Sequence, residues 1–499
     1  MTELLSFNVL TLLTLENLIV ILVGTLFGMA VGVMPGLGPT VGVALLVPMT
    51  FGMDLLPAIL LLVAVYQGAC YGGSISAIVL GIPGTASASA TVLDGNSLAK
   101  KGFPGQALGY SLYSSVIGGL IGGVALLAFM APLTRMAFRF SDPEIFLIAM
   151  FGLVTIVTLG SNNVCKNIIA LLVGLLMRSV GTDLLSGVSR FTLGIRSLHE
   201  GFVFVAVITG LFAFSEVLSM SGGELGKPTV SDNKNLRVKI PMKEFWPLMP
   251  TMIKSSLVGV FMGIIPGLGP SAASWVSYNE AKRTHSGKKF GEGEPLGIVS
   301  CEASNNACVG GALLPLLSMG IPGSGTIAVL AAAFLMQGIQ PGPQIINTQP
   351  DLLYGILWGF LIAVFALLIV GQFFTALTAR LLVIPNYILL SIIMLAIIIG
   401  SYGVRNNMFD VGVAALFGIT GFIFAKLDYP FASFLMGFVL GNLIETSFRR
   451  SLTLFRGDYL GFFGRPISVV LIIMTALLIA NSIYVAVKAR RKAARENNV

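Results

Sequence analysis

Long apolar stretches with almost no charged residue recur along the whole chain. Six of them lie at residues 18–34, 147–159, 202–214, 352–370, 387–399 and 467–480. A helix needs about 20 predominantly apolar residues to cross the hydrocarbon core of a bilayer, and each stretch reaches that length by itself or with its flanks. The pattern therefore predicts an all-α polytopic membrane protein.

Composition and charge agree with this prediction. The 499 residues are 55% hydrophobic and only 10% charged, whereas a soluble domain carries about 25% charged residues. The net charge of +8 comes from basic residues in short loops and at the tail, where they indicate topology rather than a nucleic-acid partner. The basic cluster at 488–492 predicts a cytoplasmic C-terminus. The N-terminal segment, with Glu3 and Glu16 and no Lys or Arg, does not resemble a cleavable signal peptide.

Two interruptions of the apolar pattern occur twice. GVMPGLGP at 32–39 returns as GIIPGLGP at 263–270, 231 positions later and with six of eight residues identical, and GIPG at 81–84 returns at 320–323, offset by 239. A slow drift of the offset is typical of an internal duplication with small insertions. Pro and Gly prevent a helix from running straight through, so we expect broken helices or re-entrant hairpins at all four places.

The polar segments divide the chain. We expect a first transmembrane repeat at 1–220, a cytoplasmic linker at 221–245, a second transmembrane repeat at 246–447, and an appended helix with a basic cytoplasmic tail at 448–499. Within the first repeat, 94–106 has two lysines and two late glycines and is interpreted as a loop. Residues 179–200, with several charges, are interpreted as an interfacial excursion.

Equivalent loops of the two repeats differ in positive charge. Residues 49–56 have no Lys or Arg, whereas the equivalent 282–289 has four; conversely, Lys100 and Lys101 correspond to the uncharged 338–349. This opposite bias of positive charge at equivalent loops favours inverted rather than parallel repeats. The arginines of 449–465 favour the other orientation, because they cluster where inverted repeats place the outside.

A helix interrupted within the membrane exposes backbone groups that lipid cannot satisfy, so each break must line protein or a wet cavity. Paired interruptions of this kind mark the substrate site of many transporters. The helix N-termini after the breaks favour an anionic carboxylate, and the carbonyl oxygens before them suit Na⁺. The candidate substrate or ion contacts are the break residues, the hydroxyls after them and two amides: Pro35, Gly36, Gly38, Thr40, Gly81, Pro83, Gly84, Thr85, Ser87, Pro266, Gly267, Gly269, Ser271, Ser274, Asn305, Asn306, Gly320, Pro322, Gly323, Ser324 and Thr326.

The same candidate residues also have purely structural interpretations. Small and hydroxyl residues also allow close helix packing in lipid. Glu302 is either an intramembrane carboxylate for a coupling ion or proton, or a residue near the cytoplasmic end of its helix.

Other polar residues are weaker candidates for a functional site. Span-end acids Glu216, Asp410 and Glu445 are interpreted as interfacial, and neither histidine has partners for a metal or catalytic site. The four cysteines have no metal spacing and are interpreted as small buried residues without a disulfide: Cys70, Cys165, Cys301 and Cys308.

The doubled G-x-x-x-G-x-x-P-G-x-G pattern resembles the large membrane subunit of the tripartite tricarboxylate transporter family. It comprises Gly28, Gly32, Pro35, Gly36 and Gly38 in the first copy and Gly259, Gly263, Pro266, Gly267 and Gly269 in the second. The resemblance extends from about residue 16 to 485 and includes both GIPG copies.

The resemblance implies a multi-pass protein of a bacterial inner membrane that imports citrate or a related organic acid by cation-coupled symport, with Na⁺ or H⁺ and no other cofactor. It also implies two partners, a small membrane subunit and a periplasmic substrate-binding protein. Elevator-type movement is expected by analogy with other double-hairpin carriers. The alternatives are a stand-alone anion carrier or channel and an intramembrane enzyme. The second is disfavoured by the lack of His or Cys pairs at usable spacing, and no nucleotide-binding loop is present.

Overall fold

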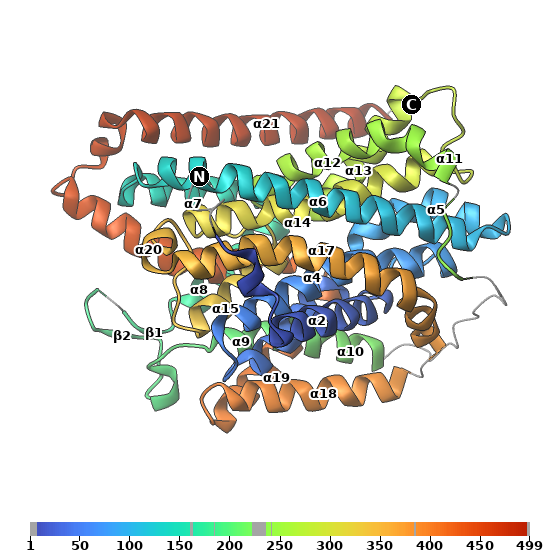
Figure 1. Cartoon of the computed structure of the whole chain (residues 1–499). Helices are drawn as coiled ribbons and strands as arrows, with labels where there is room; N and C mark the ends of the chain where they lie inside the picture. The colour runs from blue at the N-terminus through green and yellow to red at the C-terminus, as the bar shows by residue number, and fades with distance from the viewer. Residues whose placement is uncertain are drawn as a thin grey trace. The chain divides into compact units, whose positions relative to one another are not determined.

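The computed structural model describes residues 7–159, 163–183, 185–221, 236–240, 242–383 and 386–496 (Figure 1). Within these residues, nine helices are long and apolar enough to cross a membrane, and the only strands are two of two residues each. The predicted all-α polytopic class is confirmed. The predicted linker at 221–245 lies mostly outside the described residues.

The chain forms two compact units, and each contains segments of both predicted repeats. Unit 1 is 1–135 with 203–426, and unit 2 is 136–202 with 427–499. Unit 1 holds η1 (Val9–Leu12), α2 (Leu15–Val33), α3 (Gly38–Leu46), η2 (Val47–Thr50), α4 (Leu55–Leu80), η3 (Ala86–Ser89), α5 (Thr91–Lys100), nearly all of α6 (Pro104–Ala137), α9 (Phe204–Ile208), the π-helical η5 (Thr209–Phe214), α10 (Ser215–Ser221), α11 (Met242–Phe245), η6 (Trp246–Leu248), α12 (Met249–Ile264), α13 (Gly269–Thr284), α14 (Pro295–Met319), α15 (Gly325–Met336), α16 (Ile345–Thr348), α17 (Pro350–Thr378), η7 (Ala379–Val383), α18 (Asn386–Gly403) and α19 (Met408–Lys426). Unit 2 holds α7 (Asp142–Leu159), α8 (Val164–Arg178), β1 (Gly181–Thr182), β2 (Ser189–Arg190), η4 (Arg196–Leu198), α20 (Phe431–Leu454), η8 (Tyr459–Gly464) and α21 (Pro466–Glu496).

Both PGLGP motifs break their helices in the same way. α2 ends where Met34 turns extended, with ψ 116°, and α12 ends at Ile265 with the same ψ. Two glycines with positive φ follow in each copy, at +94° and +56° in the first and +91° and +64° in the second. A left-handed residue costs an L side chain about 1–2 kcal/mol, which explains glycine at these positions. The expected breaks are confirmed here.

The GIPG motifs also end helices. Gly81 caps α4 in the left-handed region with φ +73°, and Gly320 caps α14 with φ +77°. Glycine is the usual residue for this C-terminal helix cap because it has no Cβ to clash. After the second motif, Ser324 caps α15 by accepting a hydrogen bond from the Ile327 amide at 3.3 Å.

α4 and α14 form the buried centre of unit 1. Almost every residue of both helices is buried, and each packs closely along the helix that leads into a PGLGP break. A Cβ on Gly28 of α2 would lie 2.3 Å from the Val65 carbonyl oxygen, and one on Gly259 of α12 would lie 2.2 Å from that of Ser304. Small residues therefore permit backbone contact in both helix pairs.

Two sequence interpretations are corrected by the structure. The predicted loop at 94–106 is largely helical, because α5 runs to Lys100 and α6 starts at Pro104. α20 spans Phe431–Leu454 and so crosses position 447, while the repeat boundary expected there stays a prediction. All four cysteines are free thiols, but Cys165 is exposed rather than buried.

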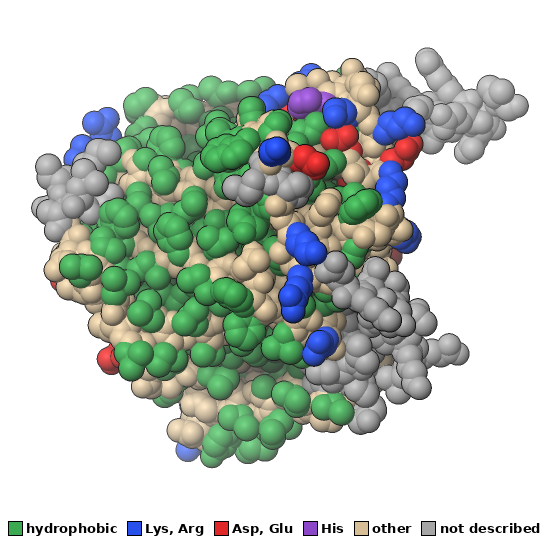
Figure 2. All heavy atoms as spheres, turned by 45° about the vertical axis from the view of Figure 1, so that its right-hand side comes forward, with side chains coloured by type: hydrophobic (Ala, Val, Ile, Leu, Met, Phe, Trp, Pro, Cys, Tyr) green, Lys and Arg blue, Asp and Glu red, His purple; other side chains and the backbone are tan. Residues whose placement is uncertain are grey.

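Unit 2 is built around α8 and α20. A Cβ on Gly174 of α8 would lie 2.1 Å from the Phe434 carbonyl oxygen of α20, so these two helices also meet at backbone distance. α21 is the least buried of the candidate spans, with only 6% of its apolar window buried. On the face of the molecule in Figure 2, apolar side chains cover a broad area and charged side chains gather along one margin, as expected for a surface that meets lipid.

Candidate functional site

Within each predicted repeat, the GIPG break packs against the helix that leads into the PGLGP break. A Cβ on Gly84 would lie 2.1 Å from the Gly32 carbonyl oxygen, and one on Gly323 would lie 2.7 Å from that of Gly263. The Gly267 amide also donates to the Gly323 carbonyl oxygen at 3.0 Å. The two kinds of break are therefore neighbours in both halves of unit 1.

The breaks also meet across the halves. Thr40 on α3 and Thr326 on α15 share a hydrogen bond between their hydroxyls at 2.8 Å, although 286 residues separate them. In the other direction, α13 packs against η3, and the Trp275 indole donates to the Ser89 hydroxyl at 2.9 Å. Each helix that follows a PGLGP break thus contacts the segment that follows the other half's GIPG break.

The remaining candidate hydroxyls have local roles. Thr85 and Ser87 are buried and share a hydrogen bond at 3.0 Å. Ser274 donates within α13 to the Pro270 carbonyl at 3.0 Å and also reaches that of Cys301 at 3.4 Å. Ser271 is half-buried at the start of α13.

Exposure differs between the break residues. Gly36 is exposed. The half-buried break residues are Pro35, Gly38, Gly81, Pro83, Gly267 and Gly320, and the buried ones are Gly84 in the first half and Pro266, Gly269, Pro322 and Gly323 in the second. The breaks of the first half are therefore more open to the surroundings than those of the second.

Amide side chains from both halves lie in the buried centre with polar atoms left over. Asn305 donates to the Cys70 carbonyl and Asn306 to that of Glu302, each at 3.3 Å, but among the described residues neither Oδ1 has a hydrogen-bond partner. Gln67 on α4 has no partner for either amide atom within the same described part of the chain. Buried polar atoms without partners are costly, which makes this centre the best candidate for receiving a polar ligand. Gln67 was missed by the sequence analysis, although it lies 238 positions before Asn305, the same offset as Cys70 to Cys308.

Two of the acids interpreted as interfacial, Glu216 and Asp410, have close contacts within unit 1. Glu216 on α10 lies at the first PGLGP break, where a Cβ on Gly36 would be 2.1 Å from its Oε1. Asp410 is fully buried and paired with Arg405 at 2.6 Å. A carboxylate therefore borders one break, which matters for any anion that binds there.

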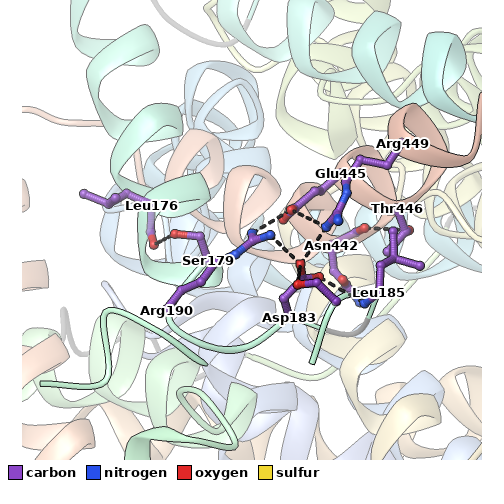
Figure 3. A network of polar contacts seen from close by, with 10 residues as sticks. Leu176, Ser179, Asp183, Leu185, Arg190, Asn442, Glu445, Thr446 and Arg449 are labelled. Atoms are coloured by element: carbon purple, nitrogen blue, oxygen red, sulfur yellow. Dashed lines mark hydrogen bonds and ion pairs between the residues drawn. The ribbon is translucent and has the colours of Figure 1, made fainter. Parts of the chain in front are cut away.

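A second polar cluster lies in unit 2, where the hairpin β1–β2 meets α20 (Figure 3). The Asp183 carboxylate accepts from Arg190 at 2.6 Å and from Arg449 at 2.7 Å, and Arg190 also donates to Glu445 at 2.6 Å. The backbone amide of Leu185 donates to Asp183 at 3.0 Å. The network holds the predicted excursion 179–200 onto α20 and lines a small cavity of about 110 Å³. Glu445, interpreted from sequence as interfacial, belongs to this network.

Acid should release this hairpin only at low pH. Hydrogen bonds from Ser186 and Arg449 hold the pKa of Asp183 well below its usual range. Because the folded pKa is lower than the unfolded value of about 3.9, the stabilisation is complete above that value and is lost as the pH falls through the folded pKa. We expect the hydrogen exchange of the Leu185 amide, corrected for its intrinsic rate, to be constant between about pH 5 and pH 8.

One variant tests the role of Asp183 in this exchange measurement, and a second variant serves as its control. In Asp183→Asn the Leu185 amide should exchange faster than in the parent throughout the range from about pH 5 to pH 8, because the variant removes the charge that both arginines contact. The control Glu292→Gln, at an exposed ion pair of 3.8 Å, should match the parent protein. Equal protection in the parent and in Asp183→Asn would contradict the assignment.

Comparisons with known proteins place these features in a family. A family model described as the tripartite tricarboxylate transporter TctA family matches residues 18–436. A protein of Agrobacterium vitis described as "Uncharacterized 52.8 kDa protein in TAR-I ttuC' 3'region" is 34% identical over 482 residues, which cover 96% of each chain. A second, "Uncharacterized protein in TAR-II ttuC' 3'region" of the same organism, is 33% identical over 234 residues, 47% of this chain and 97% of that protein. No solved structure matches the chain.

Proposed function

Because this chain belongs to the TctA family of tripartite tricarboxylate transporters, we propose that it is the permease through which a binding-protein-dependent system imports a tricarboxylate or related organic acid. Membership of the family makes it a membrane subunit of a tricarboxylate transporter. The proposal adds that the substrate passes through this chain, that partner proteins take part, and that a cation gradient drives import. The partners are a small membrane subunit and a periplasmic binding protein, in the inner membrane of a bacterium.

The observation that carries the proposal is the convergence of the four helix breaks in unit 1. The hydroxyls of Thr40 and Thr326 lie 2.8 Å apart beside the first turns of α3 and α15. Helix N-termini offer free amide donors and a positive dipole end, so a carboxylate can bind there without a buried lysine or arginine. The amide atoms of Gln67 and the Oδ1 atoms of Asn305 and Asn306, which have no hydrogen-bond partner among the described residues, supply further polar contacts in the buried centre.

A cation is part of the proposal because of the negative charge at the first break. Glu216 lies against Gly36 and would repel a carboxylate bound beside it. Entry of Na⁺ or H⁺ with the substrate offsets this repulsion, so import is a symport. The paired breaks then move together with the bound anion as an elevator, by analogy with other double-hairpin carriers.

Reconstitution tests the proposal. Proteoliposomes with the chain, the small membrane subunit and the cognate binding protein should accumulate labelled citrate or another organic acid when a Na⁺ or proton gradient is imposed. Vesicles that lack only the binding protein should accumulate little. The acid used is chosen by thermal stabilisation of the binding protein across a panel of organic acids.

The same experiment separates the rival functions. Full-rate uptake by the chain alone would favour a stand-alone carrier and would contradict the role of the binding protein. Flux that only follows the gradient of the anion itself, with no accumulation when a Na⁺ or proton gradient is imposed, would favour a channel.

A further inference from the structure

Glu302 lies in the middle of unit 1 with no exposed surface and a shell of hydroxyl groups. Its carboxylate accepts hydrogen bonds from Ser74 of α4 at 2.6 Å, from Thr91 at the start of α5, and from Ser115 of α6 at 3.1 Å. All four residues are buried. Four different helices therefore direct oxygen atoms to one point.

Among the residues that the structure describes, no positive side chain balances this carboxylate. Within the described residues, Glu302 takes part in no salt bridge, and the titratable groups that face it are Cys70 and Tyr71 of α4 and its own neighbour Cys301. None of these groups is a cation. An unpaired charge buried away from water is very costly, so the carboxylate must bind a proton or another cation that neutralises it.

The donor set indicates what enters. Two carboxylate oxygens and three hydroxyl oxygens are hard ligands, which suit a hard cation. One negative charge matches a monovalent cation, and five oxygens are more than a proton alone requires. We propose that Glu302, Ser74, Thr91 and Ser115 form a Na⁺-binding site of this protein.

The proposed Na⁺ site borders the substrate-site breaks of both halves. Ser74 follows Gly73, whose carbonyl oxygen accepts from the Gly84 amide of the first GIPG break at 3.2 Å. On the other side, Ser274 of α13 reaches the carbonyl oxygen of Cys301, adjacent to Glu302, at 3.4 Å. Occupancy of the site by Na⁺ would hold these two break segments in one arrangement, which provides a physical link between cation and anion binding.

The site exists once, not twice. At the offset of 238 that relates the two halves near this point, Ala64 takes the place of Glu302 and Ala312 takes the place of Ser74. The carboxylate comes from the second half and all three hydroxyls from the first. One Na⁺ per chain is therefore expected at this position.

Thermal unfolding of the purified chain tests the site without substrate or partners. At fixed pH and ionic strength, the melting temperature should rise with NaCl in place of choline chloride, because a ligand that binds only the folded state stabilises it. Glu302→Gln should lose this response. Thr91→Val and Ser115→Ala should each weaken the apparent Na⁺ affinity by about tenfold, as expected when a group that supports a metal site is removed.

Glu280→Gln is the matched control, because it makes the same change at a partly exposed, ion-paired glutamate of α13, and it should keep the full response. A parent protein with equal melting temperatures in NaCl and choline chloride would overturn the proposal. So would a Glu302→Gln variant that still responds to Na⁺, or stabilisation that follows pH and not Na⁺. If Glu302→Gln does not fold, the two hydroxyl variants decide.

The inference rests on the proposed function, yet the two fail separately. Absence of a Na⁺ response in the purified chain would leave the proposed organic-acid uptake untouched. Absence of uptake in the complete reconstituted system, with the Na⁺ response intact, would count against the transport proposal alone.

Discussion

Gly36→Ala should reduce organic-acid uptake by about tenfold or more, the largest functional effect that we expect from a single methyl group. Gly36 has φ +94°, where an L side chain costs about 1–2 kcal/mol. The added Cβ would also lie 2.1 Å from Glu216 Oε1, so the first break or α10 must shift. A barrier raised by about 1.4 kcal/mol already slows a step tenfold. Initial rates of labelled-acid uptake in reconstituted vesicles measure the effect.

Gly52→Ala is the control that isolates the contact with Glu216. Gly52 has the same φ of +94°, but a Cβ there would meet no atom within 4 Å. The two variants share the backbone strain and differ in the clash, so Gly52→Ala should lower the melting temperature slightly and retain uptake. Equal loss of uptake in both variants would show that strain alone is responsible. Full uptake by Gly36→Ala would remove the first break from the proposed site.

Asp94→Ala should produce the largest loss of stability, about 3 kcal/mol or more. One oxygen of this fully buried carboxylate accepts three backbone amide hydrogen bonds, from Gly291, Gly293 and Glu294, at 2.8 to 2.9 Å. The other oxygen accepts from the Tyr278 hydroxyl at 2.9 Å. Truncation leaves the buried Tyr278 hydroxyl and the three amides, whose hydrogen bonds are part-buried, without this acceptor, and a buried donor without an acceptor costs about 1–3 kcal/mol. Thermal or denaturant unfolding in detergent measures the loss.

Asp94→Asn and Asp458→Ala test the reason for that loss. Asp94→Asn keeps a carbonyl oxygen for the three amides, so its melting temperature should fall between those of the parent and Asp94→Ala. Asp458 is exposed and accepts from the single amide of Leu460 at 2.8 Å, so its truncation should have little effect. If Asp94→Ala were as stable as Asp458→Ala, the loop before α14 would not depend on α5.

Much of the fold could be predicted because the signals are local. The apolar stretch at 18–34 corresponds to α2, Leu15–Val33, and the stretch at 352–370 lies within α17, Pro350–Thr378. Proline and glycine act on their own backbone and on the next turn, so the breaks at 34–38 and 265–269 follow from the motifs alone. The predicted loop at 94–106 failed because lysines and glycines suggested a turn, whereas α5 is stabilised by Asp94 and its distant partners.

The residues of the candidate site could likewise be identified from sequence only where the signal is local. The break residues were identified from sequence, and their role as a substrate site stays a prediction. The role of Glu302 was left open between an ion site and a span end, and Gln67 was overlooked. Their significance depends on groups that are far away in the chain, such as Ser74, 228 positions before Glu302.

By itself, the sequence determined that this protein is a helical membrane protein with four interrupted segments, because hydrophobic length and the backbone chemistry of proline and glycine act within a few residues. Only the tertiary structure decided that Thr40 meets Thr326, that Glu216 borders Gly36, and that hydroxyls from three helices surround Glu302. Those contacts arise from the packing of helices across unit 1. No local pattern specifies which buried side chains share a polar pocket once lipid and neighbouring helices have excluded water.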